Sequence, residues 1–338
     1  MIEKVKWGIL GVANIAVKKV IPAMQLGQWS DITAIASRDL TKAQNAAQQL
    51  GIPKAYGSYE ELIADSEIEA IYNPLPNNLH IDWTIKAARA GKHVLCEKPI
   101  SMTVAEALPL VKVQQETGVK IEEAFMVRTN PQWVATLNLI KEGKIGEVRS
   151  VTGFFSYNNQ DPNNIRNIRE TGGGGLMDIG CYMIFFSRLV FGTEPRRVVS
   201  LVEEHPETKT DILTSALMEF PTGHATFTCS TRVTPYQRFQ IIGTTGRLEV
   251  QIPVNAPPDR PLKVFLDDGT DLTGASIRTI EFEACDQYTV QGDLFSQAIR
   301  EDREPALSLE DSIKNMAVIE AIVRSGTSGK WEVVSDTL

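Results

Sequence analysis

The 338-residue sequence predicts an α/β fold, with an N-terminal doubly wound parallel sheet followed by a C-terminal α+β domain built on a large, mostly antiparallel open sheet. Two observations favour this fold. In the first third of the chain, short β-rich runs alternate with longer helical segments, as in successive parallel β-α-β units. After about residue 125, strand-like runs follow one another with few helices between them, which is typical of an antiparallel sheet. We therefore expect two domains, residues 1–125 and residues 126–338.

The predicted elements of the first domain are bounded by recognisable caps and turns. A helix from Thr41 ends at Gly51, and Ser58 with Glu61 three residues later forms a capping box for the next helix. Further helices span residues 78–91 and 103–118, and each ends at a glycine. The predicted strands are residues 5–10, 32–37, 68–73, 93–97 and 119–125.

The second domain is predicted to contain one early helix, one buried helix and two amphipathic helices near the end. These are residues 131–142, 175–191, 286–300 and 308–325. The strand-like runs are residues 148–157, 197–203, 214–220, 224–231 and 239–243. If helices cover one face of this sheet and the other face is apolar, the open face must be buried, so we expect a homodimer or higher homo-oligomer through it.

The composition excludes several classes of protein. With 43% hydrophobic and 22% charged residues, and no apolar run of the roughly 20 residues needed to cross a bilayer, the chain is expected to be soluble. Its start carries no secretory signal pattern, so we expect it in the cytoplasm. The net charge of -8 argues against a nucleic-acid partner, which would require clustered Lys and Arg. The four cysteines and four histidines are scattered without metal-ligand spacing, so neither disulfides nor a metal site is expected.

A dinucleotide-binding turn is predicted directly after the first strand. Gly11, Ala13 and Ala16 form a G-x-A-x-x-A version of the Rossmann fingerprint G-x-G-x-x-G/A, where a strand leads into a helix. Gly11 can make the tight turn and Ala16 allows close helix packing, but Ala13 replaces the glycine that lets the backbone approach a pyrophosphate. Asn14 and Ile15 complete the turn. The alternative is a small-residue turn of the same fold that binds nothing, although the position between strand and helix favours binding.

The end of the second strand favours NADP over NAD as the cofactor. NAD-specific proteins commonly place an acidic residue there to hold the ribose 2′-hydroxyl, whereas this chain has Ser37 and Arg38, with Lys42 one turn into the next helix. A hydroxyl, a guanidinium and an ammonium supply donors to a 2′-phosphate. The alternative is that Arg38 is a solvated residue beside a helix cap, in which case NAD would serve as well.

Two further strand ends fall on the same carboxyl edge of the parallel sheet, where such sheets bind ligands. One carries Pro74, Leu75, Pro76, Asn78 and His80, and the other carries Glu97, Lys98 and Pro99. A lysine between a glutamate and a proline can be held rigidly, with its ammonium directed at a ligand. By itself, this tripeptide is also compatible with the polar end of a strand that has no catalytic role.

Asp178 and Tyr182 are the candidate catalytic residues of the second domain. They lie four apart on the predicted buried helix, so they project from one face, and they follow a flexible run of glycines that starts at Gly172. Polar groups on such an apolar helix need partners if they are buried. The structural alternative is that Asp178 caps backbone amides and Tyr182 packs as a core aromatic.

Together these motifs resemble the glucose-fructose oxidoreductase/inositol dehydrogenase/MocA family over essentially the whole chain. The resemblance rests on the glycine turn, Ser37-Arg38, the segment from Asn73 to His80, Glu97-Lys98-Pro99, GGGGLMDIGCY, and Asn164-Ile165-Arg166 before the glycine run. Many members carry histidine where this chain has Tyr182. Tyrosine there is similar to the branch that contains glucose-fructose oxidoreductase, NADP-dependent xylose dehydrogenases and dimeric dihydrodiol dehydrogenases.

The resemblance implies an enzyme that moves a hydride between NADP(H) and a CH–OH or C=O carbon of a sugar or related polyol. Tyr182 would exchange a proton with the substrate oxygen. Because a free phenol has a pKa near ~10, a cation must favour its ionised form, and Lys98 would do so while donating a hydrogen bond to the reacting oxygen. Asp178 would position a substrate hydroxyl. Further candidates for substrate contacts are Arg128, Asn164 and Arg166.

The cofactor site that the resemblance implies is extensive. It comprises Gly11, Ala13, Asn14, Ile15, Ser37, Arg38, Lys42, Pro74, Leu75, Pro76, Asn78, His80, Glu97 and Lys98. Two alternative functions share the motifs. A trans-dihydrodiol dehydrogenase would use the same residues with an apolar ring pocket, and a non-catalytic, cofactor-binding regulatory protein of the same fold could dispense with Lys98 and Tyr182. Both residues are present, which favours an enzyme.

Overall fold

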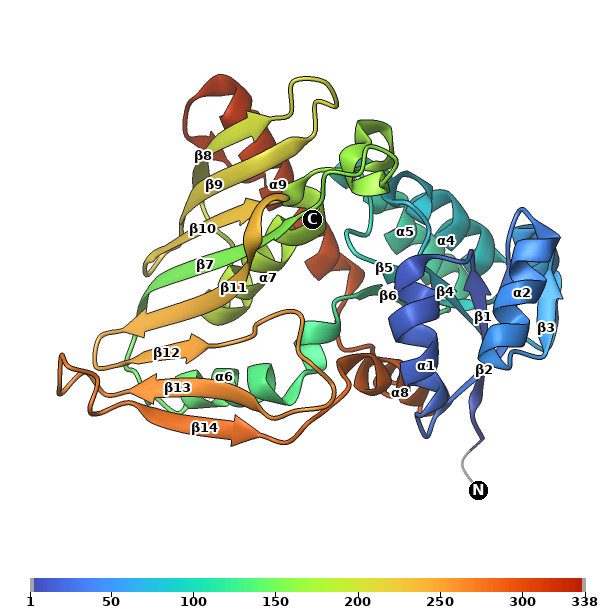
Figure 1. Cartoon of the computed structure of the whole chain (residues 1–338), viewed down its shortest axis with the longest axis horizontal. Helices are drawn as coiled ribbons and strands as arrows, with labels where there is room; N and C mark the ends of the chain where they lie inside the picture. Colours follow the sequence, from blue (N-terminus) through green and yellow to red (C-terminus); the bar gives the residue numbers. More distant parts are fainter. Residues whose placement is uncertain (1–2, 336–338) are drawn as a thin grey trace. The chain divides into compact units, whose positions relative to one another are not determined.

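A computed structural model describes residues 3–335 and divides the chain into two compact units. The first unit contains the residues up to Thr129 together with Asp286–Ile313, and the second contains Asn130–Cys285 together with the residues from Lys314 onward. Each unit is built on its own sheet (Figure 1). The predicted fold class is confirmed: a doubly wound parallel sheet and a larger, mostly antiparallel one.

The sheet of the first unit has six strands in the order β3-β2-β1-β4-β5-β6, and every neighbouring pair is parallel. The strands are β1 (Val5–Leu10), β2 (Ser30–Ala36), β3 (Lys54–Tyr56), β4 (Ala70–Asn73), β5 (His93–Glu97) and β6 (Ile121–Ala124). The strand order reverses between β1 and β4, which is the point where open α/β sheets bind ligands. The carboxyl ends of β1, β4 and β5 therefore lie at one edge of the sheet.

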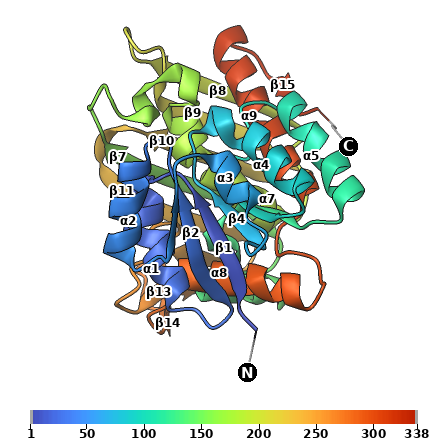
Figure 2. The ribbon, with the colours of Figure 1, turned by 90° about the vertical axis from the view of Figure 1, so that its right-hand side faces the viewer.

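Helices cover both faces of this sheet. Figure 2 shows α1 and α2 on one side of β1 and β2 and α4 and α5 on the other. Side chains of alternate strand residues point to opposite faces: Trp7 and Ile9 belong to a buried cluster with α1 and α2, whereas a Cβ at Gly8 would lie 2.5 Å from Leu62 of α3. The helices are α1 (Ile21–Gln25, preceded by a π-helical turn at Ala16–Val20), α2 (Leu40–Leu50), α3 (Tyr59–Ala64), α4 (His80–Arg89) and α5 (Val104–Thr117).

The division of the chain differs from the expected boundary at residue 125, because α8 (Gln287–Arg300) packs with the first unit. Trp7 Nε1 donates a hydrogen bond to Ser296 Oγ (3.0 Å), and the Arg300 guanidinium pairs with Glu69 at 2.7 Å. The sequence pattern identified α8 as an amphipathic helix. Periodicity does not say which core an amphipathic helix covers, so a boundary drawn along the sequence could not place it.

The sheet of the second unit has nine strands in the order β14-β13-β12-β11-β7-β10-β9-β8-β15. Neighbouring strands are antiparallel except for β7 and β10, which are parallel. The strands are β7 (Val148–Asn158), β8 (Arg197–Glu204), β9 (Asp211–Glu219), β10 (His224–Ser230), β11 (Arg232–Gly243), β12 (Arg247–Val250), β13 (Leu262–Asp267), β14 (Arg278–Phe282) and β15 (Glu332–Val333).

Helices pack on one face of this second sheet (Figure 1). They are α6 (Pro131–Lys141), α7 (Cys181–Phe191, preceded by a π-helical turn at Leu176–Gly180) and α9 (Leu309–Ser328). Trp133 of α6 stacks on Phe186 of α7 with ring centroids 3.9 Å apart, and both contact Phe239 of β11. The opposite face of the sheet carries no helix in Figure 1 among the described residues.

The stretch Arg169–Phe191 is long and apolar enough to cross a membrane, judged by length and composition over the described residues. In the structure, 78% of its most apolar window is buried within the protein. Nearly all of α7, including Phe185 and Phe186, is part of the core. The segment is therefore accounted for as a core helix, as the sequence pattern predicted.

Candidate functional site

The glycine turn after β1 has the predicted shape. Gly11 has φ of +84°, its N–H donates to Ala36 O (2.8 Å), and a Cβ at this position would lie 3.0 Å from Leu75 Cδ2. Glycine is therefore required both for the backbone conformation and for space. Ala13 and Ile15 pack against the core cluster, whereas Asn14 is exposed. The turn leaves a cradle that a larger residue at position 11 would fill, which fits a bound phosphate.

The end of β2 places the predicted 2′-phosphate donors around the start of α2. Arg38 and Lys42 are exposed, and Ser37 is buried with its Oγ accepting from Asp39 N (3.2 Å). Asp39 is the first carboxylate along the chain after this strand. Its Oδ1 accepts from Lys42 N (3.2 Å) as the N-cap of α2, so it is engaged by the helix.

The loop after β4 is tied to the loop after β5 by His80. Asn73, fully buried, donates from Nδ2 to His80 O (3.1 Å) and accepts at Oδ1 from Leu75 N (3.3 Å). The ring nitrogens of His80 contact Leu75 O (2.7 Å) and Pro99 O (2.8 Å). Burial lowers the pKa of His80 to about 4. The imidazole thus lies between the two strand ends, and in its neutral form it donates to one of the two carbonyls. Pro74 is buried and Asn78 is exposed.

Lys98 follows β5 in a segment that is fixed on both sides. Glu97 Oε1 accepts from Tyr72 Oη (2.6 Å), and Glu97 Oε2 accepts from Lys98 N (3.3 Å). The Lys98–Pro99 peptide bond is cis. Glu123 Oε1 accepts from Ile100 N (2.7 Å), so a carboxylate on β6 fixes the next residue. Tyr72 and Glu123 were not predicted from the sequence, because the side chains that meet across neighbouring strands depend on register.

The glycine run of the second unit is closely packed, which corrects the expectation that it is flexible. Gly174 has φ of +123°, and a Cβ there would lie 2.0 Å from Asp211 Oδ1. Asp211, at the start of β9, accepts at Oδ2 from Leu176 N (2.6 Å) and from Thr214 Oγ1 (3.0 Å). A carboxylate from a distant strand therefore caps the helix that carries Asp178 and Tyr182.

Asp178 is the centre of a polar cluster in the second unit. Its Oδ2 accepts from Tyr157 Oη (2.6 Å) and from Arg166 Nε (2.8 Å), and Asn164 Oδ1 accepts from Arg166 N (3.1 Å). Burial and the charge of Asp178 raise the pKa of Tyr157, so its phenol keeps its proton and donates. Three of the predicted substrate contacts, Asp178, Asn164 and Arg166, are thus brought together, and Tyr157 is an additional member.

Tyr182 lies among aromatic side chains of the second unit. It is 4% exposed, and its ring centroid lies 6.3 Å from those of Phe155 and Phe186. Arg128 belongs to the first unit, in a 3-10 turn at Met126–Thr129, where its charge opposes the rise in the pKa of buried Glu122. Lys98 also belongs to the first unit, whereas Asp178 and Tyr182 belong to the second. Within residues 3–335, no group of three or more His, Cys, Asp or Glu side chains is arranged to hold a metal ion.

Comparisons with known proteins agree with this architecture. Residues 5–125 match the model of an oxidoreductase family with an NAD-binding Rossmann fold, and residues 133–249 match the GFO/IDH/MocA C-terminal domain. The chain is 44% identical over 333 residues to an uncharacterized oxidoreductase, ORF334, of Rhizobium meliloti, covering 98% of this chain and 100% of that protein. It is 37% identical over 325 residues to D-xylose 1-dehydrogenase (NADP(+)) 2 of Haloferax volcanii, covering 96% and 98%.

A solved structure supports the same relationship. KijD10, a 3-ketoreductase from Actinomadura kijaniata in complex with NADP and TDP-benzene, superposes with a TM-score of 0.89 at 28% identity, covering 96% of this chain and 98% of that one. The family matches and the full-length relatives agree with the two sheets and with the strand-end motifs described above. The chain belongs to the Gfo/Idh/MocA family and is an oxidoreductase that acts on CH–OH groups.

Proposed function

We propose that the chain is an NADP(H)-dependent oxidoreductase that transfers a hydride between nicotinamide and a CH–OH or C=O carbon of a sugar or related polyol. The observation that carries the proposal is the convergence of Gly11, Leu75 and Lys98 at the carboxyl ends of β1, β4 and β5. The xylose dehydrogenase and the ketoreductase support the same class of reaction.

The residues at these strand ends fit the cofactor. The Gly11 cradle would receive the pyrophosphate, Ser37, Arg38 and Lys42 would hold the 2′-phosphate, and the loop from Pro74 to His80 would border the nicotinamide. Asp39 accepts at Oδ1 from Lys42 N as the N-cap of α2. When bound, the cofactor supplies or accepts the hydride.

The chain's own residues would manage the proton and the orientation of the substrate. Tyr182 would exchange a proton with the reacting oxygen, and the Lys98 ammonium would donate a hydrogen bond to the same oxygen and stabilise its developing charge. Asp178, held by Tyr157 and Arg166, would position a neighbouring hydroxyl. Several donors and acceptors in one cluster suit a polyhydroxylated substrate better than the apolar ring of a dihydrodiol.

The proposal is tested by following NADPH absorbance while a panel of aldoses, ketoses, keto-sugars and a trans-dihydrodiol is added. We expect turnover with at least one sugar. Lys98→Ala and Tyr182→Phe should each lower kcat by about 10²- to 10⁴-fold with nearly unchanged cofactor binding. Lys112→Ala, on the exposed side of α5, is the matched control. Near-normal turnover in either variant would contradict the proposed roles of Lys98 and Tyr182. Equal affinity of the wild type for NADP+ and NAD+ would contradict the cofactor assignment.

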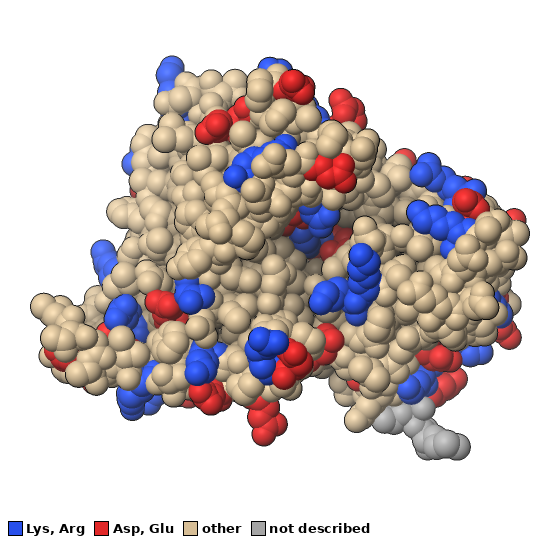
Figure 3. Space-filling view, in the orientation of Figure 1, with Lys and Arg blue, Asp and Glu red and all other residues tan. Residues whose placement is uncertain are grey.

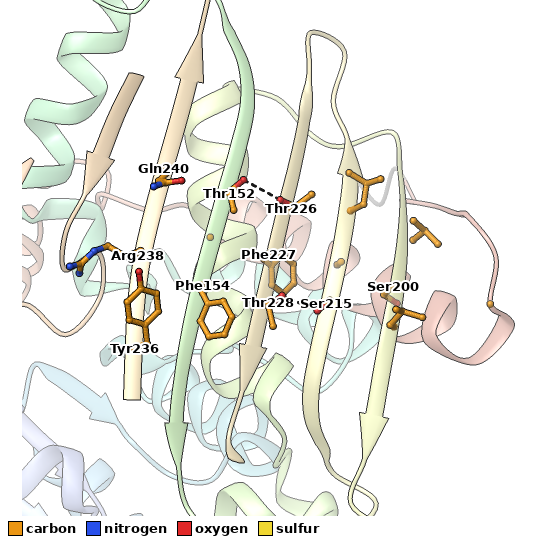
Figure 4. A pocket seen from close by; sticks show the side chains of 16 residues that line it. Thr152, Phe154, Ser200, Ser215, Thr226, Phe227, Thr228, Tyr236, Arg238 and Gln240 are labelled. Carbon is orange, nitrogen blue, oxygen red and sulfur yellow. Dashed lines mark hydrogen bonds between the residues drawn. The ribbon is translucent and has the colours of Figure 1, made fainter. Parts of the chain in front are cut away.

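The open face of the second sheet supports a homodimer or higher homo-oligomer. Figure 4 shows Phe154 and Tyr236 on this face, with Thr152 bonded to Thr226 (3.2 Å) and Thr228 to Ser215 (2.8 Å). These hydroxyls satisfy one another, and the residues lie in a shallow depression of about 540 Å³. Figure 3 shows mostly uncharged atoms over the central strands, with charges nearer the edges. We propose a second copy of the chain as its occupant.

Light scattering tests the assembly directly. We expect a dimer or larger species at micromolar concentration, and dissociation when Leu201→Asp places a charge on the face, where Leu201 is 80% exposed. Leu272→Asp, in a surface loop outside the sheet, is the control and should leave the mass unchanged. A wild-type protein that is only monomeric would contradict the proposed interface.

A further inference from the structure

The phenol of Tyr59 borders the glycine turn of the first unit. Tyr59 is the first residue of α3, is 7% exposed, and meets Trp83 of α4 edge to face at a centroid distance of 4.8 Å. A Cβ at Gly11 would lie 3.5 Å from Tyr59 Oη. The Tyr59 ring thus packs between α3 and α4. Its hydroxyl lies beside the glycine turn, where the proposed cofactor would bind.

The same hydroxyl contacts the guanidinium of Arg38 at the end of β2. The charge of Arg38 and its hydrogen bonding to the phenol both act to lower the pKa of Tyr59. A guanidinium has only N–H donors, so the phenol oxygen must accept and its own proton is left for another acceptor. Burial raises the pKa of Tyr59, and the opposing effects of Arg38 are smaller, so the phenol is protonated near neutral pH. The Tyr59 hydroxyl can therefore orient the Arg38 guanidinium and donate its own proton to an acceptor beside it.

We infer that Tyr59 is a specificity-determining residue, which aims Arg38 at the 2′-phosphate of the adenosine and donates a second hydrogen bond to the same phosphate. The inference rests on the proposed NADP(H) dependence. A phosphate monoester is a dianion near neutral pH and presents three acceptor oxygens, so it can take a guanidinium and a phenol at once. The 2′-hydroxyl of NAD carries no such charge and gains little from either group.

The inference is tested with Tyr59→Phe, which removes the hydroxyl and keeps the ring that packs on Trp83. Dissociation constants for NADP+ and NAD+ are measured by calorimetry on the full chain. We expect the constant for NADP+ to rise about tenfold, as for one hydrogen bond to a charged group, and the constant for NAD+ to change less than twofold. The selectivity ratio is the decisive readout, because a general loss of structure would weaken both cofactors alike.

Two further variants make the experiment specific. Tyr56→Phe removes a hydroxyl from neighbouring β3 that is bonded to Asp65 Oδ2 (2.7 Å), and it should leave the ratio unchanged. Arg38→Ala should abolish most of the preference for NADP+. If Tyr59→Phe binds NADP+ as the wild type does, or loses NADP+ and NAD+ equally through a pyrophosphate contact, the inference is overturned while the proposed function stands. If the wild type shows no preference for NADP+, the cofactor assignment and the inference fail together.

Discussion

The two units hold their candidate site residues by different means. In the first unit the holding groups are mostly main-chain: Gly11 N–H bonds to Ala36 O, and His80 contacts two backbone carbonyls. In the second unit they are carboxylates: Asp211 caps the helix that carries Tyr182, and Asp178 accepts from two side chains. The same kind of task, fixing a polar side chain in place, is carried mostly by backbone in the first unit, where Glu97 and Glu123 beside Lys98 are exceptions, and by carboxylates in the second.

The difference follows from the two sheets. In a parallel sheet the carboxyl ends of neighbouring strands already lie at one edge, so a short turn is enough to fix a side chain there. In the second unit the helix that carries Asp178 and Tyr182 lies in a layer packed on the sheet. Its π-helical first turn exposes backbone N–H groups that need acceptors from elsewhere. We therefore expect point mutations of the holding groups to do most harm in the second unit, where a substitution can delete the acceptor itself.

The largest effect is expected for Asp211→Ala. It leaves Leu176 N–H without its 2.6 Å acceptor at the start of the helix that carries Tyr182, so the free energy of unfolding should fall by about 1–3 kcal/mol. Turnover should fall more steeply than this suggests, because the helix also sets the position of Tyr182 and small displacements of reacting groups are costly. Urea denaturation and steady-state kinetics with the best sugar of the panel measure the two effects.

The control for this prediction is Asp271→Ala. Asp271 also accepts from backbone N–H groups, those of Thr273 and Ala275, but in an exposed loop where water can replace it. Its removal should change neither the unfolding midpoint nor kcat appreciably. An Asp211→Ala protein that matches the wild type in both measurements would show that the second unit does not depend on this carboxylate, and would break the contrast between the units.

Much of the first unit could be predicted from the sequence, because its signals are local. β1 and β5 have the predicted bounds, and Ser58 caps α3 by accepting from Glu61 N (3.2 Å), as the capping box indicated. The short strand β3 was not predicted, because its three residues, Lys54–Tyr56, are only half-buried. The location of α8 was missed for another reason: it depends on contacts with residues nearly 300 positions away.

The second unit was predicted less completely. β11 begins at Arg232, well before the predicted run at 239–243, because its first half carries Pro235 and is largely exposed, from Val233 to Tyr236. β12, β13 and β14 were not predicted, since they are short, with 4, 6 and 5 residues. Asp211 lay outside the predicted strand at 214–220, so nothing local suggested that it caps a helix some 35 residues earlier. Asp178 and Tyr182 were singled out, but Tyr157, which holds Asp178, required the fold.

A smaller effect sharpens the comparison, because the first unit also contains buried carboxylates, and burial shifts the pKa of one of them toward neutral pH. Glu122 of β6 is 4% exposed, accepts from the backbone N–H groups of Ala306 and Leu307, and faces Arg128 and Arg303. Burial outweighs these partners and raises its pKa to about 8. Between the ordinary pKa of a glutamate and about 8, the folded chain keeps a proton that the unfolded chain has released, so stability falls as pH rises.

The buried histidines act in the opposite direction at lower pH. Burial lowers the pKa values of His80 and His93 to about 4, so below pH ~6.5 the unfolded chain binds protons that the folded chain does not, and stability rises with pH there. The contribution of the histidines fades as pH rises through the ordinary pKa of ~6.5 and is nearly constant about one pH unit above it. The difference between wild type and Glu122→Gln from pH ~6.5 to 8 therefore isolates the effect of Glu122, because the histidines contribute equally to both proteins.

In that interval the free energy of unfolding should fall with a slope of at most about 1.4 kcal/mol per pH unit, and Glu122→Gln should remove this slope. Glutamine keeps an oxygen that can accept from the same backbone N–H groups, so the variant changes the titration more than the contact. Urea denaturation at several pH values measures the slope, with Glu116→Gln on the exposed side of α5 as the matched control. A slope that is the same in wild type and Glu122→Gln would mean that folding does not raise the pKa of Glu122, and this part of the comparison would fail.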